Sequence, residues 1–159
     1  MPEQATLAIR PAQAPDLAAV LALYAQPEFD AGNVLPLPAA ERLLARFADY
    51  PDYTLYVAER AGEIVGSFAL LVMYNLGHLG TPSAIVEDVV VAAAQQGTGV
   101  GTLMMRFALD RCRDKGCYKL MLCSNAKREH AHAFYESLGF ERHGFSFRVD
   151  LAAPSGEAL

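Results

Sequence analysis

The spacing of apolar residues in the first third of the chain predicts one strand and two helices. Residues 7–9 alternate between apolar and polar or small side chains, as a short strand does. Asp16 can cap a helix that follows it. The apolar positions of that helix have the i, i+3, i+4, i+7 spacing of one face and are Leu17, Val20, Leu21 and Tyr24. A loop with three prolines over 27–38 leads to a second helix, which ends before Pro51 because the residue preceding proline disfavours the helical conformation.

The middle of the chain predicts three strands. Residues 53–59 and 63–74 have strand character and are joined by a turn at Ala61-Gly62, so they should form a hairpin. Residues 75–83 hold two glycines and a proline and predict a loop. Residues 84–91 are strongly β-branched and mostly apolar, so we expect a central strand that is buried on both faces.

The C-terminal part predicts two helices and two strands. A helix over 100–115 ends at Gly116, a strand covers 119–123, and a helix over 129–138 ends at Gly139. A last strand is expected where Phe145, Phe147 and Val149 alternate with polar residues, and 152–159 should be a frayed tail. The order of elements predicts one α/β domain over residues 1–159, with a mixed sheet and helices on both of its faces.

Composition and charge exclude several classes of function. The 159 residues are 53% hydrophobic, which is ample for a core, and the net charge of −5 argues against binding nucleic acid through a broad basic surface. No apolar run reaches the roughly 18 residues of a membrane span, and the N-terminus lacks the pattern of a signal peptide. Cys112, Cys117 and Cys123 suggest neither a disulfide framework nor a metal site, so we expect a cytoplasmic protein with reduced thiols and no metal.

The segment Gln96-Gly97-Thr98-Gly99-Val100-Gly101 lies between the central strand and a helix. Its alternate glycines leave backbone N–H groups unshielded, so that they can converge on one anion. The helix that follows directs its partially positive N-terminus to the same place. The segment therefore predicts a phosphate-binding loop, although a plain glycine-rich turn would have the same short pattern.

Three kinds of phosphate-binding loop compete for this segment. A Walker loop requires a lysine after its glycines, and none follows here. A dinucleotide-binding fingerprint requires a third glycine where this chain has Thr102. The remaining pattern, Gln/Arg-x-x-Gly-x-Gly/Ala, is matched in full by Gln96, Gly99 and Gly101.

A second motif, Ala131-His132-Ala133-Phe134-Tyr135-Glu136-Ser137-Leu138-Gly139-Phe140, follows after one more strand. With the loop, it resembles the GNAT superfamily of N-acetyltransferases over nearly the whole chain. The resemblance implies a mixed, mostly antiparallel sheet of six to seven strands flanked by about four helices. Residues 85–91 are similar to glucosamine-6-phosphate N-acetyltransferases, whereas residues 124–135 are similar to aminoalkylphosphonate N-acetyltransferases.

The resemblance implies that acetyl-CoA is the acetyl donor. The backbone of Val89, Val90 and Val91 would pair with its pantetheine arm, in a cleft where this strand splays from residues 119–123. Tyr135 would give a proton to the leaving thiolate. Many members carry an asparagine where this chain has Arg128, so Arg128 and Asn125 are both candidates for coenzyme contact. The residues expected at the pyrophosphate are Gln96, Gly97, Thr98, Gly99, Val100, Gly101 and Thr102.

An amine must lose a proton before it attacks a thioester, because its pKa is about 10.4. Candidate proton acceptors are Glu87, Asp88 and His78. Strand alternation puts Glu87 on the face of Val89 and Val91, with Asp88 on the other face, and favours Glu87 as the base. The residues expected around the acceptor are Phe29, Arg42, Arg46, Tyr74 and Glu87.

The sequence thus predicts an enzyme that acetylates a primary amine of a small molecule by direct attack in a ternary complex. Two alternatives stay open: acetylation of a protein or peptide, and a non-catalytic module that senses acetyl-CoA. An intact Tyr135 and an acidic residue on the central strand favour the enzyme. The resemblance also implies a homodimer, and the charge and the absence of a long apolar run predict neither nucleic acid nor a membrane as a partner.

Overall fold

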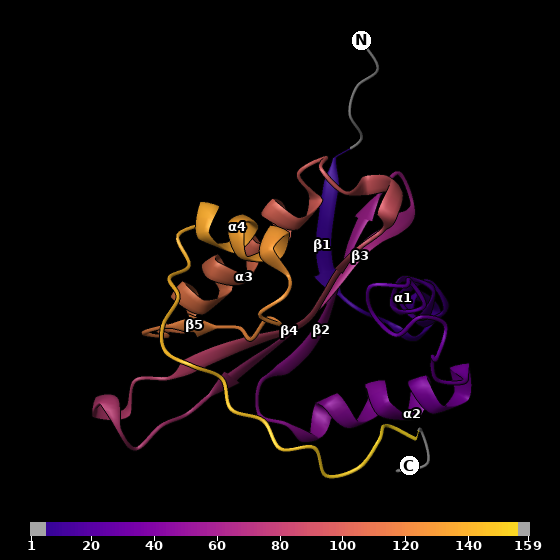
Figure 1. Cartoon of the computed structure of the whole chain (residues 1–159). Coiled ribbons are helices and arrows are strands. Elements are labelled where there is room, and N and C mark those ends of the chain that lie inside the picture. Colours follow the sequence, from indigo (N-terminus) through magenta and orange to yellow (C-terminus); the bar gives the residue numbers. More distant parts are fainter. Residues whose placement is uncertain (1–5, 156–159) are drawn as a thin grey trace.

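The computed structural model describes residues 6–155, which form one sheet with two helices on each face (Figure 1). The strands are β1 (Leu7–Pro11), β2 (Tyr53–Arg60), β3 (Glu63–Met73), β4 (Ser83–Val91) and β5 (Leu120–Met121). The α-helices are α1 (Leu17–Tyr24), α2 (Leu37–Arg46), α3 (Val100–Asp114) and α4 (Glu129–Ser137). Short 3-10 turns are η1 (Ala14–Asp16), η2 (Phe47–Asp49), η3 (His78–Gly80) and η4 (Ala93–Gln95). No helix among the described residues is long and apolar enough to cross a membrane.

The sheet follows the order β1-β2-β3-β4-β5, antiparallel up to β4 and parallel between β4 and β5. Each face of the sheet packs against its helices through a separate apolar core. The core beneath α1 and α2 includes Leu17, Val20, Ala40, Leu55, Val57 and Ala69. The core beneath α3 and α4 includes Phe68, Leu70, Val86, Val100, Met104 and Met105. The predicted α/β class and mixed sheet are confirmed, with five strands among the described residues instead of six to seven.

Strand β1 is tied to the start of α1 by a partly buried ion cluster. The guanidinium of Arg10 donates to both carboxylate oxygens of Asp16, at 2.7 and 2.9 Å, and to Glu59 on β2. Asp16 also accepts the backbone N–H of Gln13 at 2.8 Å. The expected N-cap hydrogen bond from Asp16 to α1 is absent, because its carboxylate is turned back to close η1 and hold Arg10.

We expect Asp16→Asn to lower the free energy of unfolding by about 2 kcal/mol at neutral pH, a value reduced for the partial exposure of Arg10. The hydrogen bonds from Arg10 hold the pKa of Asp16 below its usual range. The stabilisation is therefore present above the ordinary pKa of Asp and is lost as pH falls through the lowered folded-state pKa. Urea unfolding at pH 7 and pH 3 checks this, since the wild type should lose more stability between them than the variant. An equal loss would contradict it.

The predicted last strand at 145–150 is wrong. The chain there leaves α4 and passes β5 without joining the sheet (Figure 1). Its apolar side chains Phe145, Phe147 and Val149 are 90%, 92% and 78% exposed. Alternation shows that a segment can form a strand, but a strand also needs a neighbouring edge to pair with. The edge of β5 is only two residues long.

Candidate active site

The Gly-rich loop enters α3 through two glycines with positive φ, Gly97 at 75° and Gly99 at 88°. Gly99 is the N-cap of α3, in the left-handed region that glycine adopts most readily. The first bond of the helix runs from Leu103 N–H to Gly99 C=O at 3.1 Å. Five N–H groups ahead of it donate to no acceptor within residues 6–155. They belong to Gly97, Gly99, Val100, Gly101 and Thr102. The loop can therefore offer a group of free donors to an anion at a helix N-terminus.

Two other glycines allow close packing at this loop, Gly101 between α3 and α4 and Gly66 between α3 and β3. A Cβ on Gly101 would lie 3.2 Å from the ring of Phe134 on α4. A Cβ on Gly66 of β3 would lie 2.6 Å from the sulfur of Met104 on α3. Gly101 thus has a packing role that the loop pattern alone did not predict, since it brings α4 against the start of α3.

Arg60, at the end of β2, holds the loop from the sheet side and was missed by the sequence analysis. Its Nη1 donates to Gln95 Oε1 at 2.9 Å and to Thr98 Oγ1 at 3.3 Å. The Thr98 hydroxyl in turn donates to Gln95 C=O at 2.7 Å. The side chain of Thr98 therefore makes hydrogen bonds that stabilise the loop. Only the long-range register of the hairpin brings Arg60 here, so no local pattern could have found it.

Strands β4 and β5 separate where the cleft was predicted. Their parallel pairing covers only Ala84 with Leu120 and Ile85 with Met121. Beyond Ile85, the edge of β4 that faces away from β3 has no strand beside it among the described residues. Ala92 N–H donates to Val65 on β3, so the backbone groups of the alternate residues Val89 and Val91 point to this open edge.

Tyr135 lies on α4, with its ring against Phe134 at 5.2 Å and Phe140 at 5.7 Å between centroids. It packs on the same core as Val89 and Val91, on the α3 and α4 face of the sheet. Its hydroxyl makes no hydrogen bond within the described residues. Burial raises the pKa of Tyr135, and the charge of Arg128 partly offsets this. At neutral pH the phenol therefore keeps a proton that it can donate.

The turn into α4 places the two other coenzyme candidates. Asn125 Oδ1 accepts from Lys127 N–H at 2.9 Å, and Asn125 C=O accepts from Arg128 N–H at 3.0 Å. His132 contacts the same carbonyl through Nε2 at 2.9 Å. Asn125 thus stabilises the turn. The exposed Arg128 at the helix N-cap lies near enough to Tyr135 for its charge to act on the pKa of the phenol.

A β-bulge in β4 changes the predicted directions of the acidic side chains. Asp88 has a φ of 53°, and together with Val89 it lies opposite the single residue Phe68 of β3. Glu87 pairs with Ala69, whose side chain belongs to the core under α1 and α2. Val89 packs under α3 and α4. The prediction that Glu87 shares a face with Val89 is therefore wrong, because the bulge shifts the alternation.

The carboxylates of Glu87 and Asp88 both raise the pKa of Tyr53. Burial raises the pKa of Tyr53, and the charges of Asp88 and then Glu87 raise it further. Loss of hydration raises the pKa of Glu87, with a contribution from Asp88. Loss of hydration likewise raises the pKa of Asp88, with a contribution from Asp30 in the loop after α1. The bulge thus brings Glu87 and Asp88 to one side, although strict alternation predicted that they diverge.

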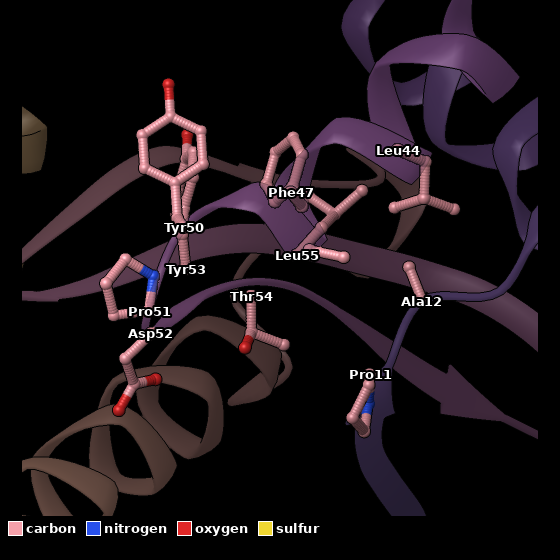
Figure 2. Close-up of a pocket in the computed structure, with 11 residues that line it drawn as sticks. Pro11, Ala12, Leu44, Phe47, Tyr50, Pro51, Asp52, Tyr53, Thr54 and Leu55 are labelled. Atoms are coloured by element: carbon pink, nitrogen blue, oxygen red, sulfur yellow. The ribbon is translucent and has the colours of Figure 1, made fainter.

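Aromatic rings line this side of the sheet. Phe29 stacks on Tyr24 at 4.6 Å between centroids, and Phe47 stacks on Tyr53 at 4.2 Å. A hollow of about 290 Å³ lies where α2 meets the start of β2, and Figure 2 shows Tyr50 and Tyr53 beside Phe47 at one end of it. Its lining includes no residue of the 96–101 loop or of α4. The hollow is therefore separate from the 96–101 loop and lies on the face of the sheet under α1 and α2.

Other predicted site residues lie elsewhere. His78, in the loop before β4, lies against Tyr118 with the ring centroids 4.7 Å apart. The four residue steps along β4 from Ser83 to Glu87 span about 13 Å, so this loop is far from the bulge. Tyr74 is 79% exposed. Arg42 is exposed on α2, and Arg46 makes only a 3.8 Å ion pair with Asp49. Phe29 and Glu87 thus lie on the face of the sheet under α1 and α2, where Arg42 and Arg46 are exposed on the outside of α2, whereas Tyr74 and His78 lie towards the loop before β4. No group of three metal-ligating side chains occurs in residues 6–155.

Comparison with known proteins agrees with this geometry. Residues 17–140 match the acetyltransferase (GNAT) family. The chain is 35% identical to a glucosamine 6-phosphate N-acetyltransferase of Trypanosoma brucei brucei, over 61% of this chain and 64% of that enzyme. It is 30% identical to an aminoalkylphosphonate N-acetyltransferase of Salmonella typhimurium, over 64% of this chain and 65% of that enzyme. It thus spans slightly less than two thirds of the length of both relatives.

The fold agrees as well. A solved Trypanosoma brucei acetyltransferase has a TM-score of 0.74 and 29% identity, and the match covers 92% of this chain and all of the other, at 100%. The family match includes the 96–101 loop, the bulged strand and α4. The chain therefore belongs to the acetyltransferase (GNAT) family.

Proposed function

We propose that this protein transfers the acetyl group of acetyl-CoA to a primary amine of a small molecule, by direct attack in a ternary complex. The observation that carries the proposal is the group of five free N–H donors at the start of α3, beside the open edge of β4. The pyrophosphate would bind the donors and the pantetheine arm would pair with Val89 and Val91. The thioester would then lie near the bulge, where β4 and β5 diverge.

In this mechanism the acid and the base approach the thioester from opposite faces of the sheet. Glu87, with Asp88 beside it, takes the proton of the amine on the α1 and α2 face. The open-edge N–H of Val89 stabilises the charge that develops on the thioester oxygen, which one well-placed donor can do by about 3 kcal/mol. Tyr135 donates its proton to the departing thiolate on the other face. Arg128, which lowers the pKa of Tyr135, favours that transfer.

We expect Glu87→Gln to lower the maximal rate by about 100-fold and to flatten its rise with pH, because the variant cannot accept the proton of the amine. In the wild type, the pKa of Glu87 is raised by burial and by Asp88. Asp88→Asn removes the second cause, so the acid limb of the pH profile should move to lower pH while most of the rate remains. Maximal rates between pH 4 and 8 check both variants. If Asp88→Asn flattens the profile and Glu87→Gln only shifts it, the base is Asp88.

The function itself is tested by release of thiol from acetyl-CoA over a panel of amino sugars, aminoalkylphosphonates, aminoglycosides and peptides. Turnover with small amines supports the proposal. Turnover with peptides alone would assign the protein to peptide acetylation. Calorimetric binding of acetyl-CoA without turnover on any acceptor would support a sensor.

A further inference from the structure

The side chain of Gln26, just after α1, lies across the end of β4. Its Oε1 accepts the backbone N–H of Ala93 at 2.8 Å. Its Nε2 donates to Leu23 C=O at 2.9 Å and to Val91 C=O at 3.3 Å. One carboxamide thus satisfies both a donor and an acceptor of the β4 end, as the backbone of a neighbouring strand would do.

The two backbone groups that Gln26 occupies belong to the open edge. Ala92 N–H points to Val65 on β3, so the C=O of Val91 and the N–H of Ala93 point the opposite way. This edge has lost its pairing with β5 beyond Ile85. The proposed function places the pantetheine arm along the same edge, between the bulge and the 96–101 loop. The arm carries amide groups, which need the same kind of partner that the Gln26 carboxamide now has.

We propose that the carboxamide of Gln26 occupies the place of a pantetheine amide on the β4 edge in the free protein and is displaced when the coenzyme binds. This inference rests on the proposed function. The contact with Val91, at 3.3 Å, is the longer of the two to β4, and the Leu23 contact at 2.9 Å offers the same amide a second acceptor within α1. Gln26 can therefore leave β4 without losing every partner of its Nε2.

Displacement of Gln26 would also reach the acceptor side. The backbone carbonyl of Gln26 accepts the N–H groups of Phe29 at 3.0 Å and Ala31 at 3.1 Å. That turn carries the ring that stacks on Tyr24 and carries Asp30, whose charge contributes to the raised pKa of Asp88. The proposal therefore also predicts that coenzyme binding and the arrangement of the turn at residues 26–31 are coupled through one residue, and such coupling acts equally in both directions.

The test compares two ligands by calorimetry: coenzyme A, and 3′-phospho-ADP, which keeps the phosphates but lacks the arm. Gln26→Met retains length and removes all three side-chain hydrogen bonds. Coenzyme A should bind the variant roughly 5-fold more tightly, which corresponds to one ordinary hydrogen bond that need no longer be broken. The affinity for 3′-phospho-ADP should not change. Gln13→Met, beside β1 at the opposite sheet edge, is the control and should bind both ligands like the wild type.

Weaker binding of coenzyme A by Gln26→Met would overturn the inference and make Gln26 a direct support of the arm. An equal change for both ligands would also overturn it, because the effect would then not depend on the arm. Thermal melting of the free variants shows whether they fold, and Gln26→Ala gives the same comparison should Gln26→Met not fold. If the wild type binds neither ligand, the proposed function fails, and that result is distinct from the other two.

Discussion

Gly99→Val should abolish coenzyme binding. Gly99 has a φ of 88° as the N-cap of α3, and a β-branched side chain in this conformation costs about 1–3 kcal/mol. No atom lies within 4 Å of an added Cβ, so the obstacle is the backbone conformation and not space. The loop would relieve the strain by turning its free N–H groups out of convergence. We expect affinity measured by calorimetry to fall by at least about 100-fold, through the strain and the lost donors together.

A matched control stands at the other end of the same helix. Gly116 has a φ of 74° and also has no atom within 4 Å of an added Cβ. Gly116→Val should therefore cost similar stability while leaving coenzyme affinity near that of the wild type. Unchanged affinity in Gly99→Val would contradict the assignment of the loop, and equal losses in both variants would show that the effect is only one of stability.

Tyr135→Phe should lower the maximal rate by about 100- to 1,000-fold and change the affinity for acetyl-CoA little. The ring contacts with Phe134 and Phe140 remain in the variant, so α4 keeps its packing. What is lost is the hydroxyl, which has no partner within the described residues and is free to give its proton to a thiolate. General acids commonly contribute rate factors of this size. Steady-state rates together with calorimetry separate the two effects.

Tyr56→Phe is the control for this change. Tyr56 also packs on the core under α3 and α4, against Phe68 at 5.2 Å and Phe107 at 5.1 Å, but it lies on β2. Its rate should stay near that of the wild type. An unchanged rate in Tyr135→Phe would remove this residue as the acid, whereas a matching loss of affinity would assign it to coenzyme binding instead.

The parts of the site that depend only on residues close together in the sequence were predictable. The glycines at 97 and 99 indicate a loop that can adopt positive φ before a helix, and both residues have that conformation. Gly139, at a φ of 91°, ends the last helix as its sequence predicted. Phe134 and Leu138 have the i, i+4 spacing of one helix face, and both pack on the core.

The rest depends on how distant segments meet. The bulge at Asp88 arises from the pairing of β3 with β4, and a single inserted residue reverses the faces that alternation assigns. Arg60 reaches Gln95 across 35 residues of sequence, and Gln26 reaches Val91 across 65. The apolar residues at 145–149 have strand spacing, but spacing carries no information about which edge would accept them.

The position of the bulge has a kinetic consequence for the proposed reaction. Glu87 belongs to the face of the sheet under α1 and α2, whereas Tyr135 and Val89 belong to the face under α3 and α4. In the proposed reaction, the amine and the coenzyme would therefore approach the point where β4 leaves β5 from opposite faces of the sheet. Neither substrate would then have to depart before the other arrives. Such a layout suits sequential kinetics, with no need for a ping-pong cycle in which the enzyme itself carries the acetyl group between substrates.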